Sequence, residues 1–366
     1  YLFLFLPLAI LCYAICPKKH RWKVLLLFSY LFFYSVSRKL LVYLLGATVL
    51  THYIGIWLET LQTEYKGRIK SLERGEKKEV KAQYIRKERG VLLCGIAAMI
   101  GVLWYLKYFN FSAAVVDQFC QQHGIGFYIQ PRAILVPLGV SFYTLQSLGY
   151  MIDVYRGTIP AEKNIGKLGL FLGFFPQIME GPICRYGETA AALYAGEQIN
   201  RENLLFGIQR IIWGMFKKIV VADRLNTLVA AVYGVSEDFG GIVVIAAAVS
   251  YTIQLYMEFS GAIDIVIGSA QIFGVQMPEN FRQPFFSRNA SEFWRRWHIS
   301  LGAWFRDYIF YPVSMSKIMK KWNKFGRAHV GEYVTKIVLT VVALFPVWFC
   351  NRFLTFSGQF WNNYMR

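Results

Sequence analysis

The residue best suited to proton transfer in this sequence is a histidine inside an aromatic segment. His298 lies within residues 292–308, where tryptophan and arginine side chains surround it in the sequence. A neutral imidazole can accept a proton near pH 7, so His298 is a candidate general base. A histidine on an aromatic face is more often a hydrogen-bonded core residue than a catalyst, and the residue types alone leave both interpretations open.

The spacing of the aromatic residues around His298 predicts one amphipathic helix. Residues three and four apart share a helix face, and most large apolar side chains of residues 294–305 fall on the face of His298. The arginines fall toward the opposite face. The further candidate site residues of this segment are Trp294, Arg295, Arg296, Trp297 and Asp307.

Two acidic residues interrupt an otherwise apolar run around Ser260 and Gly261. Glu258 and Asp264 are too far apart on a regular helix to form an obvious acid–base pair. We therefore expect them to pair with arginines of the following segment, or to line a cavity. Asn280, just before those arginines, is a further candidate.

Residues 174–186 form a third polar cluster. Pro176, Gly181 and Pro182 break a helix between apolar segments. Glu180 and Arg185 could pair across that break, while an ordinary interfacial turn with charges reaching the water is the alternative. Charges at membrane depth are costly and often serve function, so both residues are candidates for a site.

The composition predicts an all-α integral membrane protein that crosses the bilayer many times. The chain has 366 residues, of which 55% are hydrophobic and 17% charged, whereas a soluble domain carries about 25% charged residues. Long apolar runs favour helices over barrel strands, which would alternate. We expect one membrane domain over residues 1–366, with separate apolar pieces at 242–257 and 263–273.

The net charge of +18 favours a membrane surface over nucleic acid as the partner. Basic residues gather at 18–23, 66–89 and 317–327, each flanked by apolar segments, and no nucleic-acid-binding module accompanies them. Residues 59–90 are expected to form a cytoplasmic basic loop, with an amphipathic helix on the surface of the cell membrane. Scattered cysteines show no spacing typical of a metal site.

Three stretches resemble the membrane-bound O-acyltransferase family in its bacterial branch, which acts on alginate, peptidoglycan and teichoic acid. They are residues 137–157, FFPQIMEGPICRY at 174–186, and 254–312, which contains RRWHIS. The resemblance implies a helical bundle around a central funnel, with Glu180, Arg185, Glu258, Asp264 and His298 at its walls. It also implies acyl transfer from a cytoplasmic-side thioester, carried by coenzyme A or a carrier protein, to a hydroxyl of an extracytoplasmic polysaccharide or a partner acetyltransferase. No bound cofactor or metal is expected.

The sequence departs from the family pattern near its end. The family carries a second histidine after a tryptophan, and here Trp348 precedes Phe349 and Cys350. Phenylalanine cannot accept a proton, and the chain ends at Arg366, where relatives continue. We therefore expect either an active O-acyltransferase using His298 or a truncated, inactive relative that serves as a scaffold or acyl-relay partner. A transporter is a weaker alternative.

Overall fold

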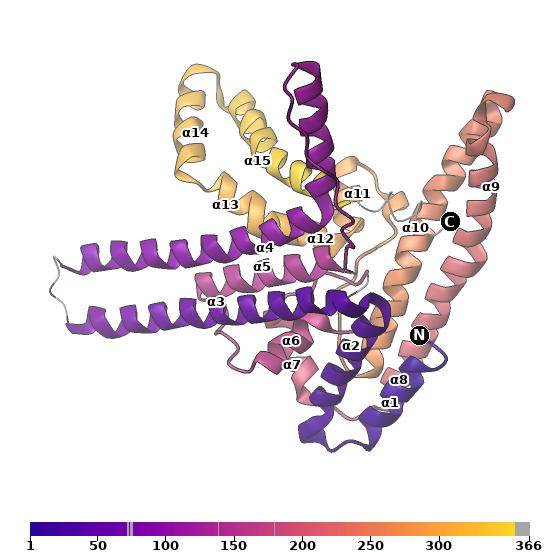
Figure 1. Cartoon of the computed structure of the whole chain (residues 1–366), viewed down its shortest axis with the longest axis horizontal. Helices are drawn as coiled ribbons and strands as arrows, with labels where there is room; N and C mark the ends of the chain where they lie inside the picture. The colour runs from indigo at the N-terminus through magenta and orange to yellow at the C-terminus, as the bar shows by residue number, and fades with distance from the viewer. Residues whose placement is uncertain (72, 74–75, 138, 179, 356–366) are drawn as a thin grey trace. The chain divides into compact units, whose positions relative to one another are not determined.

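The computed structural model describes residues 1–71, 73, 76–137, 139–178 and 180–355, and its regular elements are all helical (Figure 1). They form two compact units. Unit 1 comprises Tyr1–Ile96 and Pro137–Arg282, and unit 2 comprises Ala97–Val136 and Gln283–Arg366. The prediction of an all-α membrane protein is confirmed.

Within the described residues, three helical stretches are long and apolar enough to cross a membrane. They are Lys18–Arg68, Glu76–Gln122 and Gly241–Ile272. The first consists of α2 (Arg21–Ser37) and α3 (Leu41–Arg68), joined by the 3₁₀ turn η2 (Arg38–Leu40), and the other two are α4 and α10. A shorter apolar helix, α1 (Phe5–Ile15), precedes them, with the turn η1 (Lys18–His20) between α1 and α2.

The polar stretch of residues 59–90 contains no separate α-helix in the part that the structure describes, and its predicted place on the membrane surface stays a prediction. Instead, α3 continues to Arg68 and α4 begins at Glu76, with the turn η3 (Ile69–Ser71) between them. Lysine, glutamate and arginine are good helix formers, so both helices extend beyond their apolar parts. This stretch therefore consists of the polar ends of two long helices (Figure 1).

In the first half of unit 1, α3 packs against α5 (Val140–Arg156), and both α2 and α3 pack against α6 (Ile165–Gly173). A Cβ atom at Gly55 would lie only 2.9 Å from the Tyr150 ring. The ring therefore packs against α3 at a position where the residue has no side chain. Further along both helices, seven residues after Gly55 and four after Tyr150, the Gln62 amide donates a hydrogen bond to the Val154 carbonyl at 3.0 Å. The two contacts show that α3 and α5 run in the same direction. The helix α7 (Tyr186–Ala195) completes this part of the unit.

The second half of unit 1 is a helical hairpin. Its first arm consists of α8 (Arg201–Met215), a π-helical turn η4 (Phe216–Ala222) and α9 (Asp223–Gly234), and the turn η5 (Ser236–Asp238) leads to the other arm, α10. All three parts of the first arm pack on α10. Gly207 faces Gly268 and Gly214 faces Gly261, with the backbones in contact. Small residues allow such close packing of membrane helices.

The predicted break between residues 257 and 263 is wrong, because α10 continues without interruption from Gly241 to Ile272. Gly261 does not interrupt the helix. A Cβ atom at this position would lie 2.8 Å from the Gly214 carbonyl oxygen, so the glycine serves close packing of α10 against α8.

Unit 2 contains the second part of α4, from Ala97 on, and a series of helices after Gln283. In chain order the latter are η6 (Pro284–Phe286), α11 (Ala290–Arg296), α12 (Ile299–Phe305), the π-helical turn η7 (Arg306–Phe310), α13 (Tyr311–Ser314), α14 (Lys317–His329) and α15 (Glu332–Thr355). The basic helix α14 packs against α15, where a Cβ atom at Gly326 would meet Thr335 at 2.7 Å.

Candidate functional site

A network of charged side chains links α8 and η4 to α10 in unit 1. The Lys217 ammonium lies 2.6 Å from the Asp264 carboxylate, and each side chain is only 12% exposed. The Arg210 guanidinium lies 3.0 Å from the same carboxylate and donates two further hydrogen bonds to Glu279. Charge-assisted bonds of this kind are strong, so Asp264 fixes the register of the hairpin.

A second, more exposed group lies one and a half helical turns away along α10. The Lys218 ammonium lies 2.6 Å from the Glu258 carboxylate and 3.2 Å from Asp223. Glu180 is exposed in its turn, yet enough protein surrounds its carboxyl group that burial raises its pKa. The nearby Glu258 charge adds to this shift in pKa, while Lys218 opposes it. The Glu258 charge is therefore close enough to act on the Glu180 carboxyl group.

The sequence interpretation assigned the wrong partners to Glu258 and Asp264. In the described residues their ion pairs are with Lys218, Lys217 and Arg210, which precede them in the chain, and not with the arginines that follow. The missed signal was the occurrence of basic residues within the apolar run of residues 204–221. Basic residues in such a run require acidic partners nearby.

Two further predicted residues lie on either side of this network in the sequence. Arg185 precedes α7, and its carbonyl accepts hydrogen bonds from the amides of Glu188 and Thr189. Asn280 follows α10 and is fully buried. The predicted pairing of Glu180 with Arg185 stays a prediction.

In unit 2, His298 lies at a break between two helices. The predicted single helix over residues 294–305 is wrong, because α11 ends at Arg296 and α12 begins at Ile299. Between them, Trp297 is extended, and His298 adopts the left-handed conformation with φ 46° and ψ 54°. The helical spacing of the aromatic residues is therefore interrupted at the histidine itself.

The left-handed backbone of His298 is an unusual conformation for a residue other than glycine. It costs on the order of 1–3 kcal/mol, and such strain is often found at functional sites. His298 lies outside the candidate spans, and burial lowers the pKa of its imidazole to about 4. The ring is therefore neutral at pH 7 and can accept a proton.

Aromatic and charged side chains of α11 surround this break. The Trp297 ring stacks on Phe293, with a centroid distance of 5.6 Å and an interplanar angle of 16°. Arg296 pairs with Glu292 at 2.6 Å, one helical turn away. The predicted site residues Trp294 and Arg295 are exposed. Asp307 lies in η7, where its carboxylate is 3.2 Å from the Arg306 side chain.

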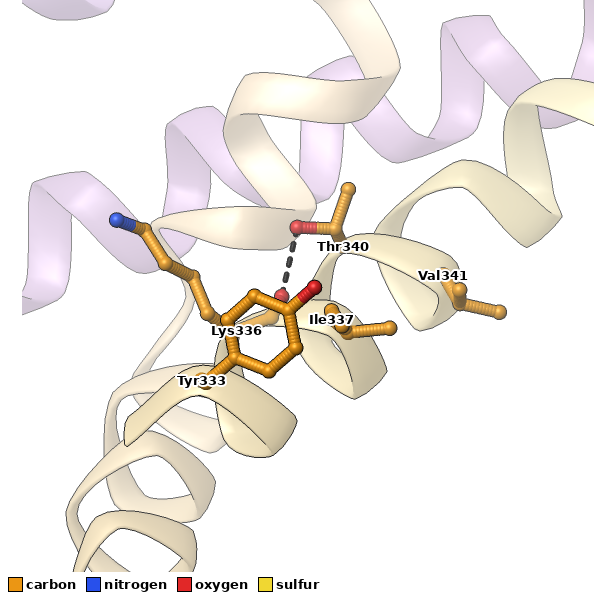
Figure 2. A pocket seen from close by; sticks show the side chains of 5 residues that line it. All are labelled: Tyr333, Lys336, Ile337, Thr340 and Val341. Atoms are coloured by element: carbon orange, nitrogen blue, oxygen red, sulfur yellow. Dashed lines mark hydrogen bonds between the residues drawn. The ribbon is translucent and has the colours of Figure 1, made fainter. Parts of the chain in front are cut away.

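A surface hollow in unit 2 does not resemble an active site. Tyr333, Lys336, Ile337, Thr340 and Val341 line it. Figure 2 shows that all five belong to one helix, α15, where the Thr340 hydroxyl donates a hydrogen bond to the Lys336 carbonyl at 2.8 Å. A hollow on one exposed helix face cannot enclose a substrate. The side chain of Phe349, further along α15, lies outside the described part of the structure.

One known protein family matches the part of the sequence that contains these residues. Residues 167–345 match the model of the membrane-bound O-acyltransferase family. The chain carries a domain of this family. The matched range contains the charged network, the Glu180 turn and the His298 break, so the O-acyltransferase domain includes every candidate residue described above.

Several bacterial proteins are similar to this chain. A probable alginate O-acetylase of Pseudomonas aeruginosa is 32% identical, covering 85% of this chain and 55% of the relative. A peptidoglycan O-acetyltransferase of Helicobacter pylori is 26% identical over 87% and 61%, and a teichoic acid D-alanyltransferase of Bacillus subtilis is 28% identical over 58% and 54%. The chain thus spans little more than half the length of these relatives.

Proposed function

We propose that this protein is a multi-pass O-acyltransferase of the cell membrane that acetylates a hydroxyl of an extracytoplasmic envelope polysaccharide. The observation that carries the proposal is the family domain over residues 167–345, which contains the strained, neutral His298. The similarity to alginate and peptidoglycan O-acetyltransferases covers more of the chain than the similarity to the teichoic acid enzyme, which favours an acetyl group.

In the proposed reaction, the His298 imidazole accepts the proton of the acceptor hydroxyl. The oxygen then attacks the carbonyl of an acyl thioester, an ester bond forms, and the thiol leaves with a proton. The donor is a thioester of coenzyme A or of a carrier protein, reached from the cytoplasmic side. The polysaccharide, or a partner acetyltransferase that passes the group on, takes up the acetyl group.

The test is an O-acetylation assay on envelope polysaccharide in cells that lack their own enzyme. The chain should restore acetyl esters, and His298→Ala should abolish them while the variant is still inserted in the membrane. Restored esters that persist in His298→Ala would show that this residue is not the base.

A second candidate function is a catalytically silent relative that acts as a scaffold or acyl-relay partner. Phe349 favours it, because the resemblance would place a histidine there and a phenylalanine cannot transfer protons. Esters that form only in the Phe349→His variant would support the silent relative. Esters formed by the unmodified chain would exclude it.

A further inference from the structure

A layer of buried polar side chains lies between α3 and α5, outside the charged network. Its members, here called the α3–α5 polar layer, are Thr51, His52, Tyr143, Gln146 and Ser147. None is more than 7% exposed. Each contributes a buried atom without a hydrogen-bond partner in the described residues: Oγ1, Nδ1, the phenol oxygen, Nε2 and Oγ respectively.

The register of the two helices places these side chains at one level. Gly55 of α3 contacts the Tyr150 ring of α5. Thr51 precedes Gly55 by four residues, and Gln146 precedes Tyr150 by four, so both lie one turn before that contact on the same helix faces. Because α3 and α5 run in the same direction, the two side chains come to the same height. This height lies in the middle of the apolar part of α3.

The other members adjoin this level. His52 and Ser147 are the next residues after Thr51 and Gln146, and Tyr143 lies one turn earlier on the same face of α5. Some buried hydroxyls elsewhere in unit 1 bond to protein, although that of Ser260 has no hydrogen-bond partner in the described residues. Thr48 donates to the Leu44 carbonyl at 2.8 Å, and Tyr13 donates to the Glu197 carbonyl at 2.9 Å.

The chemistry of the layer fits a small neutral ligand that both donates and accepts hydrogen bonds. Three members are hydroxyls, one is an amide NH₂ donor, and the imidazole can take either role. The layer itself contains no carboxylate, ammonium or guanidinium, so an ion would find no opposite charge within it. Buried polar atoms in proteins are normally satisfied, and ordered water does so where protein groups do not.

We propose that the α3–α5 polar layer binds a cluster of ordered water molecules inside the membrane body. The waters would bridge the two helices through the five side chains. The site is independent of the proposed acyl transfer, because it lies outside the charged network and does not involve His298.

X-ray radiolytic labelling of the purified full chain in lipid nanodiscs tests this proposal. Hydroxyl radicals formed from bound water oxidise adjacent side chains, so Tyr143 should be oxidised several-fold faster than Tyr13 or Tyr150. The three tyrosines are equally buried, at 1% exposure, but the latter two hydroxyls bond to protein. Equal oxidation of all three tyrosines would overturn the proposal.

The sign of a stability change gives a second, independent test. Thr51→Val should lower the unfolding midpoint temperature by a few degrees, because it removes a ligand of the bound water. The matched control Thr48→Val, in the same helix, should change the midpoint little. The Thr48 hydroxyl donates its hydrogen bond to the Leu44 carbonyl of its own helix and is not a ligand of the proposed water. A rise in the midpoint for Thr51→Val would mean that the layer is dry and would overturn the proposal.

Discussion

Gly214 of α8 and Gly261 of α10 touch through their backbones. A Cβ atom at Gly214 would lie 2.5 Å from the Gly261 carbonyl oxygen, and a Cβ atom at Gly261 would lie 2.8 Å from that of Gly214. Gly207 and Gly268 repeat the arrangement two turns away. Between the two contacts, Arg210 reaches Asp264. The close approach of the helices therefore sets the geometry of the charged network.

Gly214→Ala should destabilise the protein by about 1–3 kcal/mol, because the methyl group would force α8 away from α10. Gly46→Ala in α3 is the matched control. Nothing lies within 4 Å of a Cβ atom there, so this change should stabilise the helix by about 0.5–1 kcal/mol. Thermal unfolding of both variants in nanodiscs measures the difference. Equal midpoints would show that the glycine contact does not constrain the hairpin.

Asp264→Asn should cost about 3–5 kcal/mol, because it leaves two partly buried cations with less compensating charge. The variant should also accumulate poorly in membranes. The control Glu197→Gln removes the carboxylate of an exposed ion pair with Lys18. The Glu197 side chain is 61% exposed and that of Lys18 is 67% exposed, so this change should cost about 0–1 kcal/mol. A similar loss for the two variants would contradict a structural role for the Asp264 network.

His298→Asn should separate chemistry from folding. Asparagine tolerates the left-handed conformation but cannot act as a base, so the variant should fold while acetyl transfer falls by roughly 100- to 10,000-fold. His298→Ala should lose activity equally and be less stable than His298→Asn by about 1–2 kcal/mol. Initial rates of ester formation and unfolding midpoints provide the two measurements. An asparagine variant with normal rates would remove His298 from the reaction.

The lowered pKa of His298 predicts a specific pH dependence of stability. The imidazole titrates with a pKa of about 4 in the folded protein, whereas the ordinary value is 6.5, so the unfolded chain binds the proton more readily. Stability relative to His298→Asn should be constant above pH 6.5. It should decrease as the pH falls toward 4, by about 3 kcal/mol in total. Parallel pH series of unfolding measure this difference, and a flat difference would mean that the imidazole is well solvated.

The fold class could be predicted from the sequence, but the continuity of the helices could not. Lys, Glu and Arg in residues 59–90 suggested a separate surface helix, although the same residues also extend α3 and α4. Ser260 and Gly261 suggested a break in α10, whereas the glycine serves packing. The packing contact of Gly261 involves a neighbouring helix and is not visible in a local sequence pattern. The helix propensity of residues 59–90, in turn, fits a separate helix as well as it fits an extension of α3 and α4.

The sequence predicted which residue types belong to the candidate site, but it did not predict how they are arranged. His298 was singled out for its chemistry, but the helical spacing around it concealed the left-handed break, because the aromatic residues on both sides keep a helical pattern. Lys217 and Arg210 were missed as partners of Asp264. Their pairing depends on the antiparallel register of α8 and α10, which the glycine contacts determine.

The π-helical turn η4 makes one part of the α8–α9 arm tolerant of a change in sequence length. A π-helical turn holds an extra residue relative to an α-helix, so deletion of one residue within Phe216–Ala222 would restore regular winding. Because the wide turn absorbs the extra residue, α9 would keep its face toward α10, and Asn226 would keep its hydrogen bond from Gln254, now 3.0 Å long. A deletion within α8 or α9 would instead rotate the residues that follow it by about 100° and separate such partners. Deletions should therefore be tolerated better in η4 than in the α-helices on either side of it.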